Sequence, residues 1–545
     1  MTENVAHAIG RSLAAAGVKT VFGVVGSGNF HVTNALTEGG ARFVAARHEG
    51  AAAVMADAYA RVTGELGVLS VHQGPGLTNA MTGITEAAKS RTPLLILAPE
   101  ATAPGSNFRI DQAALATAVG AVAERVTSPS TAPADLARAC AIAVRQRRTV
   151  LLNLPLDVQA AQAPATFTMP APAAEPPRSA DADAAAALAD ALRAARRPVF
   201  VAGRGARHAD RDLSLLAERS GALLATSAVA RGLFRGHPWS LDVSGGFATP
   251  LAAELIRDAD LVVGWGSSLN MWTLRHGTLI GPETTVVQVD IDSDALGAHQ
   301  PVDLGLVGDV GATARAVSDL ADPRPDPGYR TPEIAERIAR EGRWRDVPYA
   351  EHREPGRIDP RTLSIALDDV LPAERTVAVD SGNFMGYPAM FLDVPDAEGF
   401  VFTQAYQSIG LGLATAIGAA IARPDRLTVA AVGDGGLLMG VSELETAVRL
   451  GLDLAVVVYD DEAYGAEVHH FGPDGHPLDH VRFPPADIAE IGRGFGCEGV
   501  TVRRASDLAA VGDWAKGPRD KPLVIDAKVT RDTASWWLEE AFRGH

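Results

Sequence analysis

Cysteine is scarce in this chain, which has only Cys140 and Cys497 among its 545 residues. The two lie far apart, and neither belongs to a cluster with the spacing of metal ligands. The sequence therefore predicts neither a disulfide framework nor a zinc site, and such cysteine usage is typical of a reducing compartment.

Long apolar runs and an excess of positive charge are also absent. No uninterrupted apolar segment reaches the roughly 20 residues of a membrane-spanning helix. The first residues, MTENVAHAIGRSLAAAG, indicate an amphipathic helix and lack the basic start of a signal peptide. The formal net charge of -17 argues against nucleic acid, whose phosphates require concentrated Lys and Arg. We therefore expect a cytoplasmic protein with no membrane and no nucleic-acid partner.

The sequence does contain a regular alternation of short apolar runs and helical patterns. Its 47% apolar and 21% charged residues are ordinary for a globular protein, and 545 residues suggest about three domains. Runs such as TVFGVVG, PLLILAPE and TVLLNLPLD are separated by helical stretches, which predicts parallel sheets covered on both faces. We predict an α/β fold with three doubly wound parallel-sheet domains, at residues 1–165, 180–322 and 356–545. A Pro- and Ala-rich linker that includes Pro170 and Pro172 separates the first two.

A short repeat links the first and third blocks. GSGNF at residues 26–30 and DSGNF at residues 380–384 each follow an apolar strand. The shared Ser-Gly-Asn-Phe can arise by chance, but its place at the same strand-to-helix turn also favours an internal duplication. Ligands of open parallel sheets bind at the carboxyl ends of strands, so both loops are candidate ligand contacts.

The third block carries the strongest chemical signal. Gly433, Asp434, Gly435 and Gly436 directly follow a strand, where glycines let the backbone approach a phosphate and an Asp can hold a divalent cation. The strand of VVVYDD returns to the same sheet edge after one helix and places Asp461 27 residues after Asp434. We predict a metal ion that clamps a diphosphate; the alternative is two unrelated turns.

These residues resemble the diphosphate and magnesium motif of thiamine-diphosphate-dependent enzymes, in the branch with acetolactate synthase, pyruvate decarboxylase and benzoylformate decarboxylase. The resemblance covers essentially the whole chain, in the order pyrimidine-binding, central and diphosphate-binding domain. It implies thiamine diphosphate and Mg²⁺ as cofactors, with Asp434, Asp461 and the main-chain carbonyl of Ala463 as metal ligands. The cofactor contacts that it implies are Val25, Gly26, Glu49, Asn79, Gly382, Asn383, Phe384, Ile409, Gly433, Asp434, Gly435, Gly436, Asp461, Ala463, Tyr464 and Gly465.

The motif departs from the family at two places. Asp460 and Asp461 stand where the family usually has paired asparagines, and Gly436 stands where it has Ser. The extra carboxylate keeps the ligand oxygen but adds negative charge near a diphosphate. Metal binding should therefore depend more on pH and on free cation.

A glutamate in the first block completes the resemblance. RHEGAAAVMADAYARVTG places Glu49 at the start of a helix. The resemblance implies that its carboxyl binds the aminopyrimidine ring and so promotes proton removal from the thiazolium ring. Read alone, Glu49 is an acidic first-turn residue that faces the helix dipole.

Other candidate site residues follow from the same resemblance. His72 lies 23 residues after Glu49, where benzoylformate decarboxylase has an active-site histidine, and Ser27 matches a serine that faces the substrate carboxylate there. Gln112 lies where acetolactate synthases carry a glutamine that reaches the cofactor site. Ile409 matches the aliphatic residue that supports the bent cofactor.

The segment after the metal motif suggests a polar pocket. Glu467 and His470 are three residues apart on one expected helical face and can shuttle protons beside the reacting carbon. The alternative is a solvated helix end. A second active-site histidine is missing from the central domain, where Asn270 and Met271 occur.

Two further segments are less specific. VFVAGRGARHAD has Gly203 and Gly205 but His208 in place of a third glycine, so FAD is not supported. The end of the chain, with Trp536, Trp537, Leu538 and Phe542, is either a lid or, as we expect, a docked tail.

We therefore predict a thiamine-diphosphate- and Mg²⁺-dependent decarboxylation of a 2-oxo acid, with transfer of the acyl group to a second carbonyl compound as in acetolactate synthase. The alternatives are simple decarboxylation as in benzoylformate decarboxylase, a flavin oxidase of the same family, and a non-catalytic homologue. The resemblance implies a homodimer or homotetramer whose active site lies at the subunit interface, with Glu49 from one chain and Asp434 and Asp461 from another.

Overall fold

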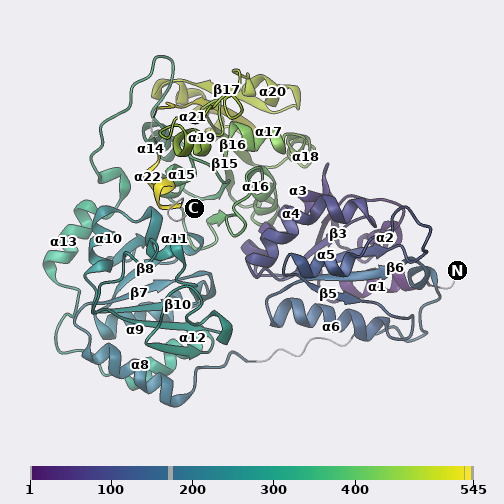
Figure 1. The fold of residues 1–545 in the computed structure, drawn as a ribbon, viewed down its shortest axis with the longest axis horizontal. Coiled ribbons are helices and arrows are strands. Elements are labelled where there is room, and N and C mark those ends of the chain that lie inside the picture. Colours follow the sequence, from purple (N-terminus) through teal and green to yellow (C-terminus); the bar gives the residue numbers. More distant parts are fainter. Residues whose placement is uncertain (1–2, 170–175, 533, 542–545) are drawn as a thin grey trace.

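Three parallel six-stranded sheets, each flanked by helices, form the chain (Figure 1). The computed structural model describes residues 3–169, 176–532 and 534–541. The strands of the three sheets span residues 20–155, 198–307 and 375–528. The predicted α/β class with three doubly wound domains is thus confirmed, whereas the predicted domain boundaries stay predictions.

The N-terminal sheet has the strand order β2-β1-β3-β4-β6-β5. Its strands are β1 (Thr20–Gly23), β2 (Arg42–Ala45), β3 (Gly67–Ser70), β4 (Leu94–Glu100), β5 (Val122–Arg125) and β6 (Thr149–Pro155). Its helices are α1 (Val5–Ala15), α2 (Phe30–Glu38), α3 (Glu49–Thr63), α4 (Pro75–Lys89), α5 (Gln112–Ala118), α6 (Ala132–Arg145) and α7 (Leu156–Ala160).

The central sheet has the order β12-β11-β10-β7-β8-β9. Its strands are β7 (Pro198–Ala202), β8 (Leu223–Thr226), β9 (Ser240–Val243), β10 (Leu261–Trp265), β11 (Thr285–Asp290) and β12 (Leu304–Val307). The helices of this part are α8 (Ala182–Ala194), α9 (Asp210–Ser220), α10 (Pro250–Arg257), α11 (Met271–Leu274), α12 (Val310–Leu320) and α13 (Pro332–Glu341).

The C-terminal sheet has the order β14-β13-β15-β16-β18-β17. Its strands are β13 (Arg375–Val379), β14 (Phe400–Phe402), β15 (Leu427–Gly433), β16 (Leu454–Asp460), β17 (Glu498–Val502) and β18 (Leu523–Lys528). Its helices are α14 (Pro360–Val370), α15 (Gly386–Phe391), α16 (Gly412–Ala422), α17 (Asp434–Met439), α18 (Glu443–Arg449), α19 (Gly465–Phe471), α20 (Ile488–Gly494), α21 (Ala509–Lys516) and α22 (Trp536–Ala541).

The first and third sheets share one topology. When the strands of each sheet are numbered 1 to 6 along the chain, both the first and the third sheet have the order 2-1-3-4-6-5. The central sheet has the order 6-5-4-1-2-3. The two SGNF loops follow β1 and β13, which occupy the same place in their sheets. This agreement supports the duplication that the repeated letters suggest.

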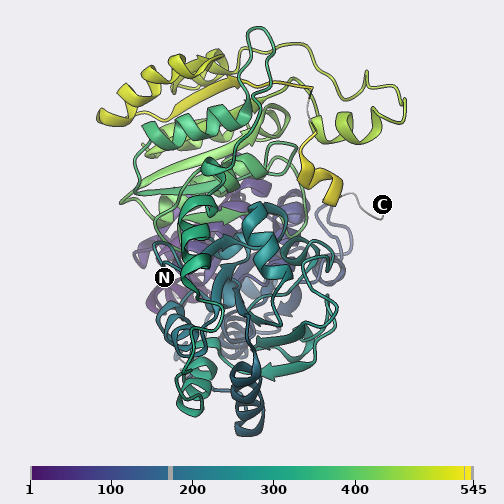
Figure 2. The same cartoon turned by 90° about the vertical axis from the view of Figure 1, so that its left-hand side faces the viewer.

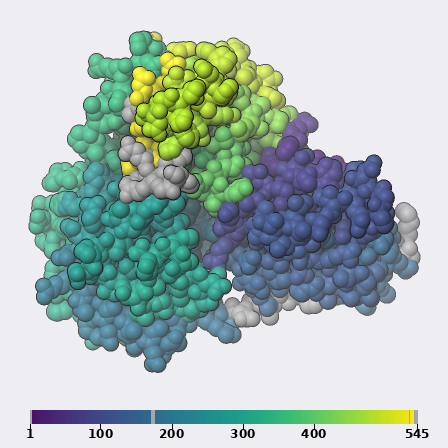
Figure 3. Space-filling model, viewed as in Figure 1, coloured from purple at the N-terminus to yellow at the C-terminus, as the bar shows by residue number. Residues whose placement is uncertain are grey.

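Equivalent helices of the two related domains pack against each other. α3 follows β2 and α16 follows β14, and the two helices share one buried apolar cluster (Figure 1). Gly418 on α16 lies so close to α3 that an added Cβ would stand 2.3 Å from the carbonyl oxygen of Met55. Small residues thus bring the two domains together, and Figure 3 shows the N-terminal lobe seated against the C-terminal one.

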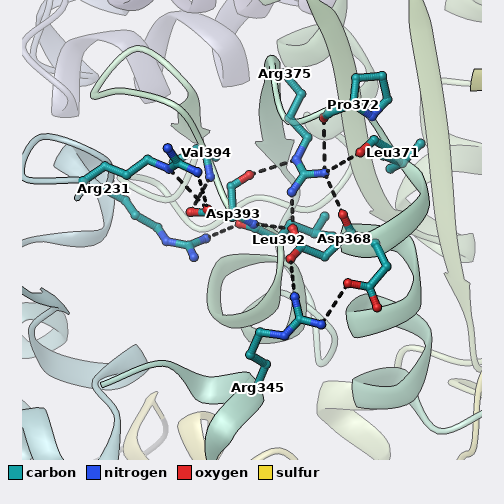
Figure 4. A network of polar contacts seen from close by, with 11 residues as sticks. Arg231, Arg345, Asp368, Leu371, Pro372, Arg375, Leu392, Asp393 and Val394 are labelled. Atoms are coloured by element: carbon teal, nitrogen blue, oxygen red, sulfur yellow. Dashed lines mark hydrogen bonds and ion pairs between the residues drawn. The ribbon is translucent and has the colours of Figure 1, made fainter. Parts of the chain in front are cut away.

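An arginine network joins the central and C-terminal domains (Figure 4). Arg375 is buried at the end of α14, where its guanidinium pairs with Asp368 and donates to the carbonyl of Pro372 at 3.3 Å. The last carbonyls of a helix have no partner within the helix, and the guanidinium also donates to one of them, the carbonyl of Asp368, at 3.4 Å. Arg231 of the central domain donates to the carbonyl of Leu392 at 2.6 Å. The network therefore fixes the orientation of one domain on the other.

The C-terminal segment is docked, as expected. Trp537 is buried, and its indole packs edge-on against Tyr387 with ring centroids 4.8 Å apart. Figure 2 shows this segment, in yellow, next to the yellow-green segment that contains α19. Phe542 of the predicted tail, and Pro170 and Pro172 of the predicted linker, lie outside the described residues. Among the helices of the described residues, none is both long and apolar enough to span a membrane.

Candidate cofactor and active site

Asp434 and Asp461 lie at the carboxyl ends of neighbouring strands. β15 pairs with β16 in parallel, and Gly433 is opposite Tyr459, so Asp434 and Asp461 follow adjacent strand ends. The predicted return of the chain to this sheet edge is confirmed, although two short helices, α17 and α18, form the crossover instead of one. Gly451 has φ of 59° after α18, which suits the helix end expected there.

The two carboxyl groups form an electronegative site. Burial raises the pKa of Asp434 to about 8, and the charges of Asp461 and Asp460 add to this effect. Burial and the charge of Asp460 likewise raise the pKa of Asp461 to about 7. In the described part of the chain, no lysine or arginine forms an ion pair with either carboxylate. A buried and a half-buried carboxylate without a protein cation fit a divalent metal ion.

Two glycines let carboxylates approach the backbone closely around this turn. A Cβ on Gly465 would lie 2.2 Å from Oδ2 of Asp461, and one on Gly436 would lie 2.6 Å from Oδ2 of Asp380. A cavity of about 430 Å³ opens beside Asp434 and is also lined by Met439 and Tyr464. The serine that the family usually carries in place of Gly436 would meet Asp380 here.

Asp460 differs from its neighbour because it has a buried cation. Lys528 on β18 is opposite Asp460 in the sheet and forms an ion pair with it. The ammonium also lies 3.0 Å from Oδ2 of Asp526 and donates to the carbonyl of Ala486 at 2.8 Å. The other oxygen of Asp460 accepts the N–H of Glu462 at 3.1 Å. Asp460 therefore orders the turn, and Lys528 is its counter-charge.

We expect Lys528→Met to destabilise the C-terminal domain. Removal of the cation leaves Asp460 and Asp526 buried side by side, and breaking a buried ion pair costs about 3–5 kcal/mol. The double variant Lys528→Met/Asp460→Asn should recover part of this loss because one of the two charges is gone. Scanning calorimetry of the full chain measures both; equal transition temperatures for wild type and Lys528→Met would contradict the assignment.

Glu49 is the first residue of α3, as predicted. Its Oε2 accepts a hydrogen bond from the amide of Asn79 at 3.0 Å, and its side chain is partly exposed. His48 caps the helix, since its Nδ1 accepts the N–H of Gly50 at 3.0 Å. The Glu49 carboxyl is thus hydrogen-bonded to Asn79 through one oxygen, and the side chain stays partly accessible to solvent.

Ser27 and His72 come together at the same sheet edge. Ser27 Oγ lies 3.3 Å from Nε2 of His72, whose Nδ1 lies 2.8 Å from the carbonyl oxygen of Gln73. That carbonyl can only accept, so Nδ1 carries the proton and Nε2 accepts from the serine hydroxyl in the neutral ring. Phe108 packs edge-on against the imidazole with centroids 5.2 Å apart. The ring is therefore oriented for proton exchange through Nε2.

Gln112 lies in a different environment from the other predicted site residues. It is only 3% exposed; its amide nitrogen donates to Asn153 at 2.8 Å, and its oxygen accepts the N–H of Gly74 at 3.3 Å. In this chain its polar groups therefore hold the loop before α4. Its predicted contact with the cofactor site stays a prediction.

The Ile409 loop is held by a residue that we did not predict. Asp380, at the end of β13, is fully buried and accepts the N–H groups of Ser381 at 2.8 Å and Gly410 at 3.0 Å. Burial raises its pKa to about 6. Its place in the DSGNF loop was the available signal. Val25 lies in the equivalent loop after β1, and Gly382, Asn383 and Phe384 follow Asp380.

Glu467 and His470 lie three residues apart on α19, as predicted, and both are partly exposed. His470 packs against Phe471 with centroids 4.6 Å apart. Tyr464 precedes the helix and packs against Phe483. Their proposed role in proton transfer stays a prediction.

Within one chain the two groups of candidate residues remain separate. Among residues 3–169, 176–532 and 534–541, no hydrogen bond or ion pair links Glu49 or His72 with Asp434 or Asp461. Apolar side chains are exposed near both groups: Val25 is 39% and Met439 57% exposed.

A cavity of about 630 Å³ lies beside the central sheet, and residues of the N-terminal and C-terminal domains also line it. It lies at the carboxyl ends of β7 and β10, where the strand order reverses, and Gly203, Gly205 and His208 line it. Asn270 lies in the region where a second active-site histidine is missing. Its side chain caps α11 by accepting the N–H groups of Trp272 and Thr273. No finding here tests the expectation that FAD is not supported.

Known protein families match all three parts of the chain. The models named thiamine pyrophosphate enzyme, N-terminal TPP binding domain, central domain and C-terminal TPP binding domain match residues 3–118, 185–317 and 380–527, respectively.

Relatives from several bacteria align over nearly the whole chain. A probable 2-ketoarginine decarboxylase of Pseudomonas aeruginosa is 32% identical, over 92% of this chain and 89% of its own length. A sulfoacetaldehyde acetyltransferase of Castellaniella defragrans is 29% identical over 97% and 94%. A catabolic acetolactate synthase of Raoultella terrigena is 29% identical over 91% and 90%. These matches, together with the three sheets, show that the chain belongs to the thiamine pyrophosphate enzyme family and is a thiamine-diphosphate-dependent enzyme.

Proposed function

We propose that this enzyme decarboxylates a 2-oxo acid with thiamine diphosphate and Mg²⁺, at sites formed between two subunits. The single observation that carries the proposal is the pair of neighbouring carboxylates, buried Asp434 and half-buried Asp461, beside a glycine-rich turn and without an ion-paired lysine or arginine in the described residues. These oxygens and the carbonyl of Ala463 would hold the metal ion, and the glycine turn would accept the diphosphate.

The residues of the N-terminal domain supply proton chemistry in this proposal. When bound, thiamine diphosphate supplies an electron sink for the pair released as the carbon–carboxylate bond breaks. Glu49 offers a carboxyl that Asn79 orients toward the open side of α3. Nε2 of His72 would take up a proton, either from solvent or from the hydroxyl of Ser27. It would then donate this proton to the product carbon after carbon dioxide leaves.

The sequence predicts a second fate, transfer of the acyl group to another carbonyl compound. Two of the relatives support it, because one is named an acetyltransferase and another an acetolactate synthase. The Ser27–His72 pair favours simple protonation, as in a decarboxylase. Both functions share the decarboxylation step, so their products distinguish them.

The test uses purified protein with thiamine diphosphate, Mg²⁺ and a panel of 2-oxo acids. The panel should contain pyruvate, an aromatic 2-oxo acid and 2-ketoarginine, since one relative is named for the last. We expect carbon dioxide and an aldehyde; a hydroxyketone or a new 2-hydroxy acid would indicate acyl transfer. No turnover of any acid, with no cofactor binding by calorimetry, would leave only a non-catalytic homologue. A yellow protein with flavin absorbance would favour the alternative of a flavin oxidase, and a colourless protein would remove it.

We expect two inactive variants to complement each other. In a homodimer with shared sites, a Glu49→Gln chain and an Asp461→Ala chain together build one site that has both residues intact. Random pairing of co-expressed chains in a two-fold dimer should restore about a quarter of wild-type activity. Chains expressed separately and never mixed are the control. If the co-expressed pair stays inactive while both variants dimerise, the sites do not combine Glu49 and Asp461 from different chains.

A further inference from the structure

Two buried glutamates lie in the corresponding crossovers of the related domains, between the third and fourth strand of each. Glu86 lies near the end of α4, which follows β3, and Glu443 begins α18, which follows β15. The side chains are 0% and 1% exposed. Charged side chains are rarely buried unless they are paired or hydrogen-bonded, so each needs a structural or functional reason.

Each glutamate binds the backbone of the other domain. Oε1 of Glu443 accepts the N–H groups of Arg47 and His48, both at 3.0 Å. The carboxylate of Glu86 accepts the N–H groups of Ala405 at 3.2 Å and Tyr406 at 2.7 Å. The bound residues directly precede Glu49 in one domain and the Ile409 loop in the other. The exchange is therefore reciprocal across the α3–α16 contact.

The two glutamates differ in whether a cationic side chain pairs with the carboxylate. Arg61 lies 2.7 Å from Oε1 of Glu86, and although burial opposes it, this cation lowers the pKa of Glu86. In the described part of the chain no ion pair reaches Glu443, and burial raises its pKa. The guanidinium of Arg47 turns away to Glu445, at 2.6 Å. Glu443 thus relies on backbone N–H groups and on the hydroxyl of Thr446, which donates to its Oε2 at 2.7 Å.

We propose that Glu443 is a positioning residue for Glu49. Its carboxylate fixes the peptide groups of Arg47 and His48 and so sets where α3 begins, while Asn79 sets the direction of the Glu49 side chain. A misplacement of a catalytic side chain by about 1 Å can lower the rate roughly 100-fold. We therefore expect the two hydrogen bonds that Glu443 accepts to matter for turnover. The role in catalysis rests on the proposed function.

The experiment compares Glu443→Gln with Glu445→Gln. Gln keeps the size of the side chain but loses the charge and one acceptor oxygen, whereas Glu445 accepts hydrogen bonds from the guanidinium groups of Arg47 and Arg449. We expect Glu443→Gln to lower kcat by roughly 10- to 100-fold with KM for the 2-oxo acid within about twofold of wild type. Glu445→Gln should keep wild-type kinetics. Thr446→Val, which removes one support of Glu443, should show a smaller loss and provides the test if Glu443→Gln is insoluble.

Two readouts separate positioning from a purely structural role. In a Glu49→Gln background, Glu443→Gln should add less than about a twofold further loss, because it acts through Glu49. Hydrogen exchange at the amides of residues 47 and 48 should accelerate in Glu443→Gln and not in Glu445→Gln. Full activity of Glu443→Gln, or an independent loss in the Glu49→Gln background, would overturn the inference while the proposed function stands. Wild-type protein that turns over no 2-oxo acid would overturn both, whatever the exchange rates.

Discussion

Asp461→Ala should lose Mg²⁺-dependent cofactor binding. The side chain lies at the end of β16, directly beside the Asp434 strand end, and the two adjacent carboxylates are already ion-paired, Asp460 with Lys528 and Glu462 with Arg357. Changes that merely perturb a ligand cost roughly 10- to 100-fold in metal affinity, so loss of the ligand should exceed about 100-fold. Calorimetric titration of thiamine diphosphate at fixed Mg²⁺ measures this loss.

Asp461→Asn should retain binding. The amide keeps a ligand oxygen and is the residue that the family usually has at this position. Asp474→Ala, which removes an exposed carboxylate after α19, controls for the change in net charge. If Asp461→Asn is as inactive as Asp461→Ala, the additional negative charge is itself functional and the turn has a role beyond holding a metal ion.

Glu49→Gln should abolish most of the turnover while the cofactor still binds. Gln keeps the hydrogen-bonding shape beside Asn79 but cannot exchange a proton. Loss of a positioned acid–base group typically costs roughly 10²- to 10⁴-fold in rate, and we expect kcat to fall within this range. Steady-state decarboxylation rates at saturating cofactor provide the measurement.

The matched control for Glu49 is Glu38→Gln on α2, whose side chain is 64% exposed and lies 3.4 Å from Nε2 of His7 on α1. Its rates should equal those of wild type. A Glu49→Gln protein that keeps wild-type kcat would show that Glu49 only faces the helix dipole, which is the reading that its position alone supports.

Much of the fold was predictable from local sequence patterns. Continuous apolar runs bounded by turn residues mark strands buried on both faces, and the strands β4, β6, β15 and β16 fit this pattern. β5 was missed because Val122–Arg125 is a short edge strand that ends in two charged residues and is incompletely buried. Edge strands lack the two-sided burial that gives a continuous apolar run.

The part of the candidate site that one continuous segment forms was predictable from the sequence. Gly433 to Gly465 forms a single crossover, so spacing alone brings Asp434 and Asp461 to one edge. Lys528 could not be assigned to Asp460, because it lies 68 residues later and pairs only through the adjacency of β16 and β18. Glu443 looked like an ordinary helix start in SELETAV, since its burial depends on packing against another domain.

The most direct test of this account is a calorimetric titration of thiamine diphosphate into the wild-type protein, with and without Mg²⁺. We predict one binding event per chain in the presence of Mg²⁺ and none after a chelator removes the metal ion. Binding that survives the chelator, or that is absent with Mg²⁺, would contradict the assignment of Asp434 and Asp461 as the ligands of a diphosphate-bound metal ion.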